Sequence, residues 1–104
     1  MQFIIQAYDG KDAGAPERRK INRPDHLNAV KGQGKLGQIL VASGILDEED
    51  RVIGSLIVAN FNSLKDLREK WLDSEPYVVS KVWEDIRIIP CTVPEMFISR
   101  NFDD

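Results

Sequence analysis

The order of its apolar segments is the feature that most constrains how this chain can fold. Runs rich in β-branched and apolar residues, which are typical of strands, occur at residues 2–8, 36–42, 52–60 and 82–93. Helical patterns separate the first run from the second and the third run from the fourth. The order β-α-β-β-α-β is that of the split βαβ, or ferredoxin-like, unit. The sequence therefore predicts an α+β fold in which a four-stranded antiparallel sheet carries both helices on one face.

The first helix is expected to form in two pieces. Pro16 suits the first turn of a helix, where its missing N–H costs nothing. A residue that precedes a proline avoids the α region, so we expect a kink or a restart at Pro24. His26 then lies in the second piece, which Gly32 and Gly34 are expected to end.

The second helix has a start signal and an apolar stripe. Ser63 and Asp66 match a capping box, in which the serine accepts a hydrogen bond from a free backbone N–H. Leu64, Leu67 and Trp71 follow at helical spacing. This stripe indicates packing against the core.

The length and the strand composition predict one domain that forms a homodimer. A chain of 104 residues fits a single domain over residues 1–104. The strands at 2–8 and 52–60 are apolar at more positions than one buried sheet face requires. A second copy packing sheet against sheet would cover the other face, so we expect a two-fold dimer. Residues 94–104 form a tail that a small domain would bury with difficulty, and packing on the partner subunit is one place for it.

Composition excludes several classes of function. The one histidine rules out sites that need two imidazoles, and we expect neither a metal nor a cofactor. The excess of 17 Asp and Glu over 14 Lys and Arg argues against a nucleic-acid binder. No run approaches the roughly 20 apolar residues of a membrane span. The one cysteine, Cys91, cannot form an internal disulfide, which favours a reducing compartment and a cytoplasmic location.

Charge is distributed unevenly along the chain. Residues 1–35 carry seven Lys and Arg against four acids, or +3, and the remaining 69 residues carry seven against thirteen, or −6. The basic excess lies at residues 18–20 and at Arg23. A solvated helix face is the usual explanation of such a run. The alternative is an anion-binding wall beside His26.

Three other motifs are better explained by structure than by chemistry. Residues 32–37 spell G-x-G-x-x-G, but a helix precedes them and a strand follows, which is the reverse of the dinucleotide-binding arrangement. The four acids of residues 47–50 lack the spacing of a calcium loop and indicate a solvated hairpin tip. Cys91 is expected to be an inert core residue, because free cysteines are commonly buried.

His26 is the candidate for chemistry. Arg23 precedes it by three residues, so both side chains lie on one side of a helix. A guanidinium can bind a carboxylate or phenolate in a planar fork, and an imidazole can move a proton. A histidine at the surface or at the edge of the core is the alternative.

Several motifs then occur in order along nearly the whole chain: Tyr8-Asp9, Arg23-Pro24-Asp25-His26-Leu27, Ala42-Ser43-Gly44, Phe61, Trp71 and Glu75-Pro76-Tyr77-Val78. Through them the chain resembles the YCII-related (YciI-like) family of small dimeric α+β-barrel proteins. The resemblance implies a ferredoxin-like protomer, a two-fold dimer and a cleft between the sheet and the first helix. It also implies a His–carboxylate pair as the active site.

The resemblance assigns catalytic roles to three residues. His26 is the family's histidine, Asp9 is the acid after the first strand, and Glu75 stands where the family usually has aspartate before proline. It leaves open whether Asp9 or Glu75 pairs with His26. The implied substrate-binding residues are Arg23, Ser43 and Gly44. Lys81 is a departure, because many members have glycine before the last strand.

Two functions therefore remain. The first is a cofactor-independent acid–base enzyme of lyase or isomerase type, which acts on a small anionic or phenolic molecule with His26 as general acid and base. The resemblance implies similar chemistry, of lyase or dehydrochlorinase type, on hydroxylated rings. The alternative is a non-catalytic dimeric module that binds a small ligand. A carboxylate within hydrogen-bond reach of His26, beside a cavity, would favour the enzyme.

Overall fold

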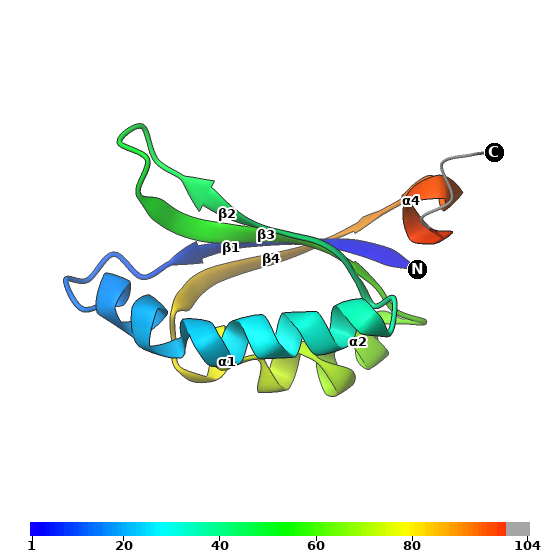
Figure 1. Cartoon of the computed structure of the whole chain (residues 1–104), viewed down its shortest axis with the longest axis horizontal. Coiled ribbons are helices and arrows are strands. Elements are labelled where there is room, and N and C mark those ends of the chain that lie inside the picture. The colour runs from blue at the N-terminus through cyan, green and yellow to red at the C-terminus, as the bar shows by residue number, and fades with distance from the viewer. Residues whose placement is uncertain (100–104) are drawn as a thin grey trace.

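The computed structural model describes residues 1–99 and confirms the α+β architecture (Figure 1). Its sheet is antiparallel with the strand order β2-β3-β1-β4, which is the ferredoxin-like order. The elements follow one another as β1 (Gln2–Asp9), α1 (Ala15–Lys35), β2 (Ile39–Leu46), β3 (Val52–Asn60), α2 (Leu64–Lys70), the 3₁₀ turn η1 (Leu72–Ser74), α3 (Pro76–Val79), β4 (Trp83–Cys91) and α4 (Glu95–Ser99).

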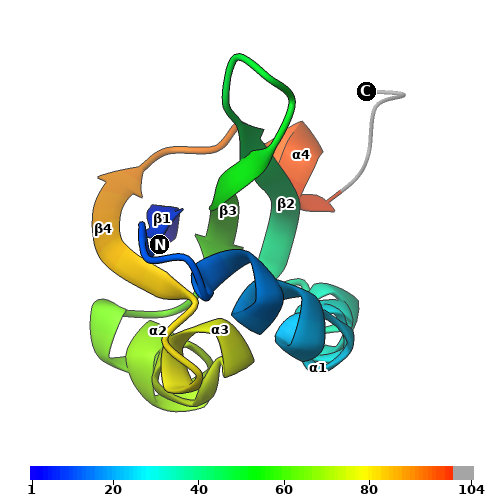
Figure 2. The same ribbon diagram turned by 90° about the vertical axis from the view of Figure 1, so that its left-hand side faces the viewer.

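The hydrophobic core lies between one face of the sheet and the helices. Seen from the end in Figure 2, α1, α2 and α3 lie together on one side of the strands. Side chains alternate along β1, so Phe3, Ile5 and Ala7 are buried beneath these helices. Ile5 pairs with Ile57 in β3, and Trp71 closes the core from the end of α2.

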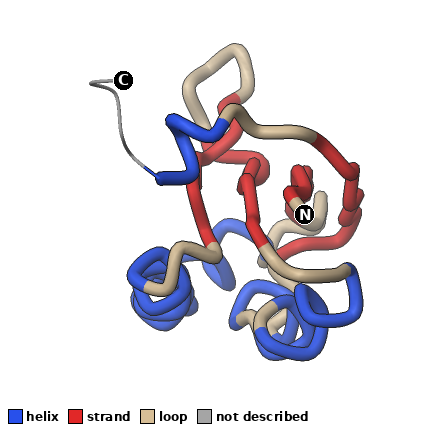
Figure 3. The backbone as a smooth tube through the Cα atoms, turned by 90° about the vertical axis from the view of Figure 1, so that its right-hand side faces the viewer, coloured by secondary structure: helices blue, strands red, loops and turns tan. Residues whose placement is uncertain are grey.

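The opposite face of the sheet is largely open in the single chain. Ile4 pairs with Val58 on one side and with Ile89 on the other, so these three side chains share this face. Ile4 and Val58 are half-buried, and Ile89 is exposed. Figures 2 and 3, from opposite ends, place α4 on this side of the sheet, away from the other helices. The expected dimer would use this face.

Helix α1 continues through Pro24, so the expected restart there is wrong. Proline lacks the N–H that would bond to the carbonyl of Lys20. Both Pro24 and Lys20 are exposed, so water can reach that carbonyl. The preference of the preceding residue for an extended backbone is a local tendency, and the packing of the whole helix on the sheet overrides it.

The predicted end of α1 at Gly32 and Gly34 is also wrong. The helix continues to Lys35, and Gly37, with a φ of 74°, ends it. The Gly37 N–H bonds to the Gly34 carbonyl and the Gln38 N–H bonds to the Gln33 carbonyl. This is a Schellman motif, in which glycine takes the left-handed position just after the helix.

The strand boundaries follow from this longer helix. The Schellman turn occupies residues 36–38, so β2 begins at Ile39 and extends to Leu46, where a turn was expected. The boundaries of β3 are as predicted, and β4 is shorter than the expected 82–93. The expected cap of α2 is confirmed in part, since the Ser63 hydroxyl accepts from the Asp66 N–H. Within the predicted tail, residues 100–104 lie outside the described residues.

Candidate functional site

His26 is a buried side chain in the middle of α1. Its exposed fraction is 7%. The imidazole stacks on the Tyr77 ring, with centroids 3.9 Å apart and planes 8° apart, and Trp83 meets it edge-on. The Tyr77 ring comes from α3 and Trp83 from β4, so three distant segments of the chain hold this one ring in place.

Glu75 is the acid that pairs with His26. Its Oε1 lies 2.5 Å from the His26 Nδ1, and its side chain is fully buried. The carboxylate also accepts hydrogen bonds from the Trp71 Nε1 at 3.1 Å and the Tyr77 backbone N–H at 3.2 Å. The second bond caps α3, so the Glu75-Pro76 motif has a structural reason as well as a chemical one.

This pairing determines which imidazole nitrogen is available for chemistry. An ionised carboxylate can only accept hydrogen bonds, so Nδ1 must carry the proton that lies between His26 and Glu75. In the neutral ring Nε2 then holds the lone pair. Within residues 1–99 no hydrogen bond engages Nε2, so this atom can exchange a proton with a bound molecule.

His26 lines a pocket of about 250 Å³ between α1 and the strands β2 and β3. Three of the residues predicted to bind substrate also line it: Arg23, Ser43 and Gly44. The Ser43 hydroxyl donates to the Leu56 carbonyl at 3.2 Å, and Arg23 is exposed. Glu75 does not line the pocket, because it lies behind the imidazole. The structure therefore brings His26, Glu75 and the predicted binding residues together.

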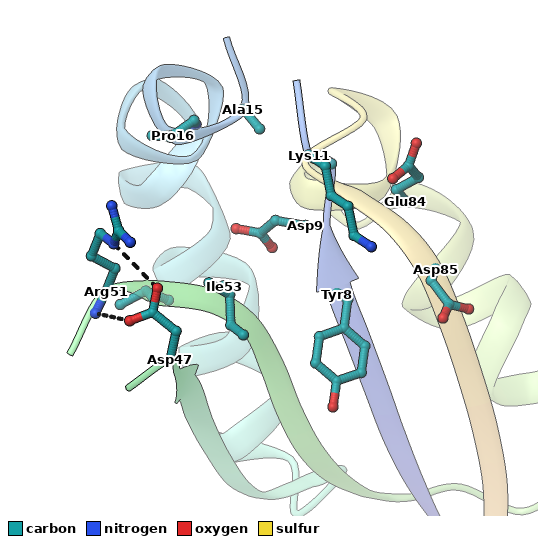
Figure 4. A pocket seen from close by; sticks show the side chains of 12 residues that line it. Tyr8, Asp9, Lys11, Ala15, Pro16, Asp47, Arg51, Ile53, Glu84 and Asp85 are labelled. Atoms are coloured by element: carbon teal, nitrogen blue, oxygen red, sulfur yellow. Dashed lines mark hydrogen bonds and ion pairs between the residues drawn. The ribbon is translucent and has the colours of Figure 1, made fainter. Parts of the chain in front are cut away.

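Asp9 lies elsewhere. Its carboxylate accepts two hydrogen bonds from Arg19, at 2.6 Å and 3.0 Å, and among residues 1–99 it makes none with His26. It lines a separate, larger cavity of about 710 Å³ at the C-terminal end of β1, beside the Asp47–Arg51 pair at the hairpin tip (Figure 4). The chemistry favours the smaller pocket as the site, because the larger cavity contains no imidazole.

Arg19 is a site residue that the sequence analysis placed only in the basic run of residues 18–20 and did not assign to the site. It lines the small pocket, and its guanidinium lies 4.8 Å from the centre of the Tyr77 ring. Arg19, Arg23 and His26 are spaced i, i+4, i+7, which is one face of a continuous helix. The signal was present in the sequence, but a break at Pro24 would have destroyed this alignment.

The guanidinium groups of Arg19 and Arg23 both act on the hydroxyl of Tyr77. Burial raises the pKa of the Tyr77 hydroxyl above its usual value, because the ionised phenolate would lose its hydration. The charges of Arg19 and Arg23 pull that pKa in the opposite direction. The charges of Asp9 and Glu75 raise it. The uneven charge of the sequence thus places two guanidinium groups beside His26, one of them paired with Asp9.

Two of the three motifs judged to be structural have local roles. Residues 32–37 end α1, and Asp47 caps the hairpin turn by accepting from the N–H groups of Glu49 and Arg51. Cys91 is half-buried at the end of β4 rather than in the core. Among residues 1–99 there is no group of three or more His, Cys, Asp or Glu side chains that could hold a metal ion, and no helix long and apolar enough to cross a membrane.

Known proteins resemble this chain in sequence and in fold. The model of the YCII-related domain matches residues 1–92. Protein YciI of Escherichia coli O6:H1 (strain CFT073) and of Shigella flexneri are each 31% identical, over 86% of this chain and 95% of the relative. The 5-chloro-2-hydroxyhydroquinone dehydrochlorinase TftG of Burkholderia phenoliruptrix AC1100, solved with 2,5-dihydroxybenzoquinone, shares the fold at 17% identity. Its TM-score is 0.76, over 91% of this chain and 97% of that one.

Proposed function

Because this chain belongs to the YCII-related family, we propose that it is a cofactor-independent acid–base enzyme of lyase or isomerase type. Its substrate is a small anionic or phenolic molecule, and His26 is the general acid and base. The dehydrochlorinase activity of a neighbour with the same fold supports enzymatic chemistry as a class. The non-catalytic ligand-binding module is the alternative that the experiment below separates.

One observation carries the proposal: one nitrogen of His26 is held by a buried carboxylate while the ring lines a pocket. The Glu75 carboxylate fixes the tautomer and stabilises the imidazolium that forms when Nε2 takes a proton. In an elimination, Nε2 accepts the substrate's proton and the leaving group departs with the electrons of its bond. In an isomerisation, Nε2 returns the proton at another atom.

The size and charge of the pocket support the substrate class. A volume of about 250 Å³ lies below the roughly 300–1,000 Å³ of pockets for drug-sized ligands, so the ligand is small. Arg23 makes no ion pair within residues 1–99 and can bind a carboxylate or phenolate. Ser43 and Gly44 line the pocket from β2, opposite α1.

We further propose that a second copy covers the open face of the sheet, in a two-fold dimer. Val41 and Ile89, 48% and 42% exposed, lie there with the half-buried Ile4 and Val58. The dimer would remove this apolar surface from water. The free thiol of Cys91 favours a cytoplasmic location. A monomeric mass in light scattering would contradict the dimer.

The test measures binding and turnover separately. Binding of 2,5-dihydroxybenzoquinone is followed by calorimetry, and chloride release from 5-chloro-2-hydroxyhydroquinone is followed without oxygen. The wild-type protein is expected to bind the quinone. It is also expected to turn over 5-chloro-2-hydroxyhydroquinone or another hydroxylated ring from a small panel of such compounds. His26→Gln is expected to lower turnover by about 10²–10⁴-fold while binding persists, since general acid–base catalysis contributes about that much.

Three outcomes would contradict the proposal. Binding without turnover of any panel member would favour the binding module. Equal turnover by His26→Gln and wild type would remove the role of His26. No binding of any anionic or phenolic ring would overturn the substrate class.

A further inference from the structure

Two neighbouring arginines of α1 make similar ion pairs in different surroundings. Arg18 holds Asp12 with two hydrogen bonds, of 2.7 Å and 2.8 Å, outside the His26 pocket. Arg19 holds Asp9 with two hydrogen bonds, of 2.6 Å and 3.0 Å, and lines the pocket. The side chain of Asp12 is 57% exposed, whereas that of Asp9 is 8% exposed. The second pair is therefore the desolvated one.

The hydrogen bonds that Arg19 makes within the protein use only part of its donors. Its Nε and Nη2 bond to Asp9, and Nη2 also donates to the Ser55 hydroxyl at 2.9 Å. The same hydroxyl accepts from the Trp83 Nε1 at 3.1 Å, so the support is itself held in place. Within residues 1–99 the Nη1 atom of Arg19 makes no hydrogen bond. One N–H₂ group thus remains for a ligand.

The position of Nη1 is fixed by more than these bonds. The guanidinium of Arg19 lies over the Tyr77 ring, and the His26 imidazole stacks on the same ring. Arg19 and His26 are thereby held by one common side chain. A donor held in this way needs no reorganisation when charge develops on a substrate in the pocket.

We infer that Arg19 is a catalytic residue that stabilises the oxygen on which negative charge develops, and that Asp9 is a positioning residue that acts through Arg19. The inference rests on the proposed function and deepens it. When Nε2 of His26 takes a proton from the substrate, the electrons of that bond move onto a substrate oxygen beside Nη1. Arg23, which has no acidic partner among residues 1–99, binds a charge that the substrate already carries.

This assignment also narrows the substrate class. With Asp9 beside it, Arg19 presents a directional donor within a pair that is neutral overall, and the full free charge comes from Arg23. The site therefore suits a small molecule with one ionised group and a second oxygen that is a carbonyl or a hydroxyl at rest. An ionised hydroxyquinone and an enolisable keto acid both meet this description.

The test compares the affinities of the protein for an ionised ring and a neutral ring, so it does not depend on turnover. Affinities are measured for 2,5-dihydroxybenzoquinone and for hydroquinone. The quinone is a dianion at neutral pH, so it carries charge on a second oxygen, as the substrate does once it has lost its proton, whereas hydroquinone is neutral. Arg19→Gln is expected to lower the preference for the ionised ring about tenfold or more, the effect of one charge-assisted hydrogen bond. Arg19→Lys keeps the charge without the fork and is expected to recover only part of it.

Asp9→Asn separates positioning from charge. It makes the site more positive, so Coulomb attraction alone would tighten binding of the ionised ring. Loss of the positioning of Arg19 weakens binding, and we expect Asp9→Asn to have a three- to tenfold lower affinity for the quinone. Arg18→Gln and Asp12→Asn are the matched controls on the neighbouring ion pair, and we expect each to change that affinity by less than twofold.

Each outcome decides the inference. The inference would be overturned if Asp9→Asn bound the quinone more tightly than wild type does. It would also be overturned if substitutions in the Arg18–Asp12 pair changed the affinity as much as those in the Arg19–Asp9 pair. Either result would leave the role of His26 intact. If Arg19→Gln does not fold, Arg19→Lys and Asp9→Asn still give the comparison. Absence of turnover with the Arg19 selectivity present would count against the proposed function alone.

Discussion

Replacing Glu75 with glutamine tests the buried His26–Glu75 pair most directly. The substitution keeps the shape of the side chain and removes its charge. The side chain is fully buried, and its two oxygens accept hydrogen bonds from three donors: the His26 Nδ1, the Trp71 Nε1 and the Tyr77 N–H. A glutamine amide has one oxygen and one N–H₂ group. The N–H₂ group of the glutamine would therefore face an N–H donor of His26, Tyr77 or Trp71 at one of the two carboxylate positions.

The size of the effect follows from this geometry. Leaving a buried donor without its acceptor costs about 1–3 kcal/mol. One kilocalorie per mole shifts the melting temperature of a domain of this size by about 4–8 °C. Glu75→Gln is therefore expected to lower the Tm at neutral pH by at least about 4 °C. The exposed Glu49, paired with Arg51 at 2.8 Å, gives the matched control, since Glu49→Gln is expected to cost less than about 1 kcal/mol.

Urea unfolding, followed by tryptophan fluorescence and circular dichroism, measures both variants. A double-mutant cycle with His26→Asn isolates the coupling between the two side chains, which we expect to be about 1–3 kcal/mol. If Glu75→Gln destabilised the protein no more than Glu49→Gln does, the reasoning would be refuted. The carboxylate would then not be the buried partner of His26.

Three further predictions concern the backbone and one exposed ion pair. Lys81 has a φ of 60°, so Lys81→Gly is expected to raise the free energy of unfolding by about 0.5–1 kcal/mol; a decrease would contradict it. A Cβ on Gly54 would lie 2.4 Å from a carbonyl oxygen of β1, so Gly54→Ala should lower the free energy of unfolding by at least about 1–3 kcal/mol. Gly32 lies on an open helix face, so Gly32→Ala should raise the free energy of unfolding by about 0.5–1 kcal/mol, and thermal unfolding measures both variants. Arg18 lowers the pKa of Asp12 from 3.8 to about 2, so its stabilisation is present above pH 3.8 and is lost as the pH falls through about 2. The stability difference between wild type and Asp12→Asn should shrink over that range in acid titrations, and a difference independent of pH would exclude the linkage.

Secondary structure was predictable wherever a pattern was local and strong. The third strand was placed at its observed boundaries, because residues 52–60 are mostly apolar and four of the nine are β-branched. The start of α2 was predictable from Ser63, whose hydroxyl caps the helix as expected. The first helix was divided wrongly at Pro24, because the rule applied there describes one residue and its neighbour, whereas a helix of 21 residues is stabilised along its whole length.

The candidate site was predictable only as a set of residue types. The motif around His26 indicated a histidine, a nearby arginine and one of two acids. The choice between those acids depends on side chains that are 17 and 49 positions from the histidine, and chain distance does not decide it. Arg19 was recognised only as part of the basic run at residues 18–20, because its alignment with His26 requires a continuous helix.

The amino-acid order by itself determined the succession of strands and helices, since hydrophobic periodicity is a local property that each segment carries alone. It also determined that one imidazole and a cluster of arginines lie close together in the chain, within residues 18–26. Only the tertiary structure decided that Glu75 meets His26 and that Asp9 meets Arg19. The two carboxylates differ by where the fold buries them: Glu75 is enclosed behind the imidazole by the packing of α3, and Asp9 lies at the end of β1, within reach of the fork of Arg19. Such pairings arise when the elements pack, because the free energy of a buried charge depends on all the groups around it and not on its neighbours in the chain.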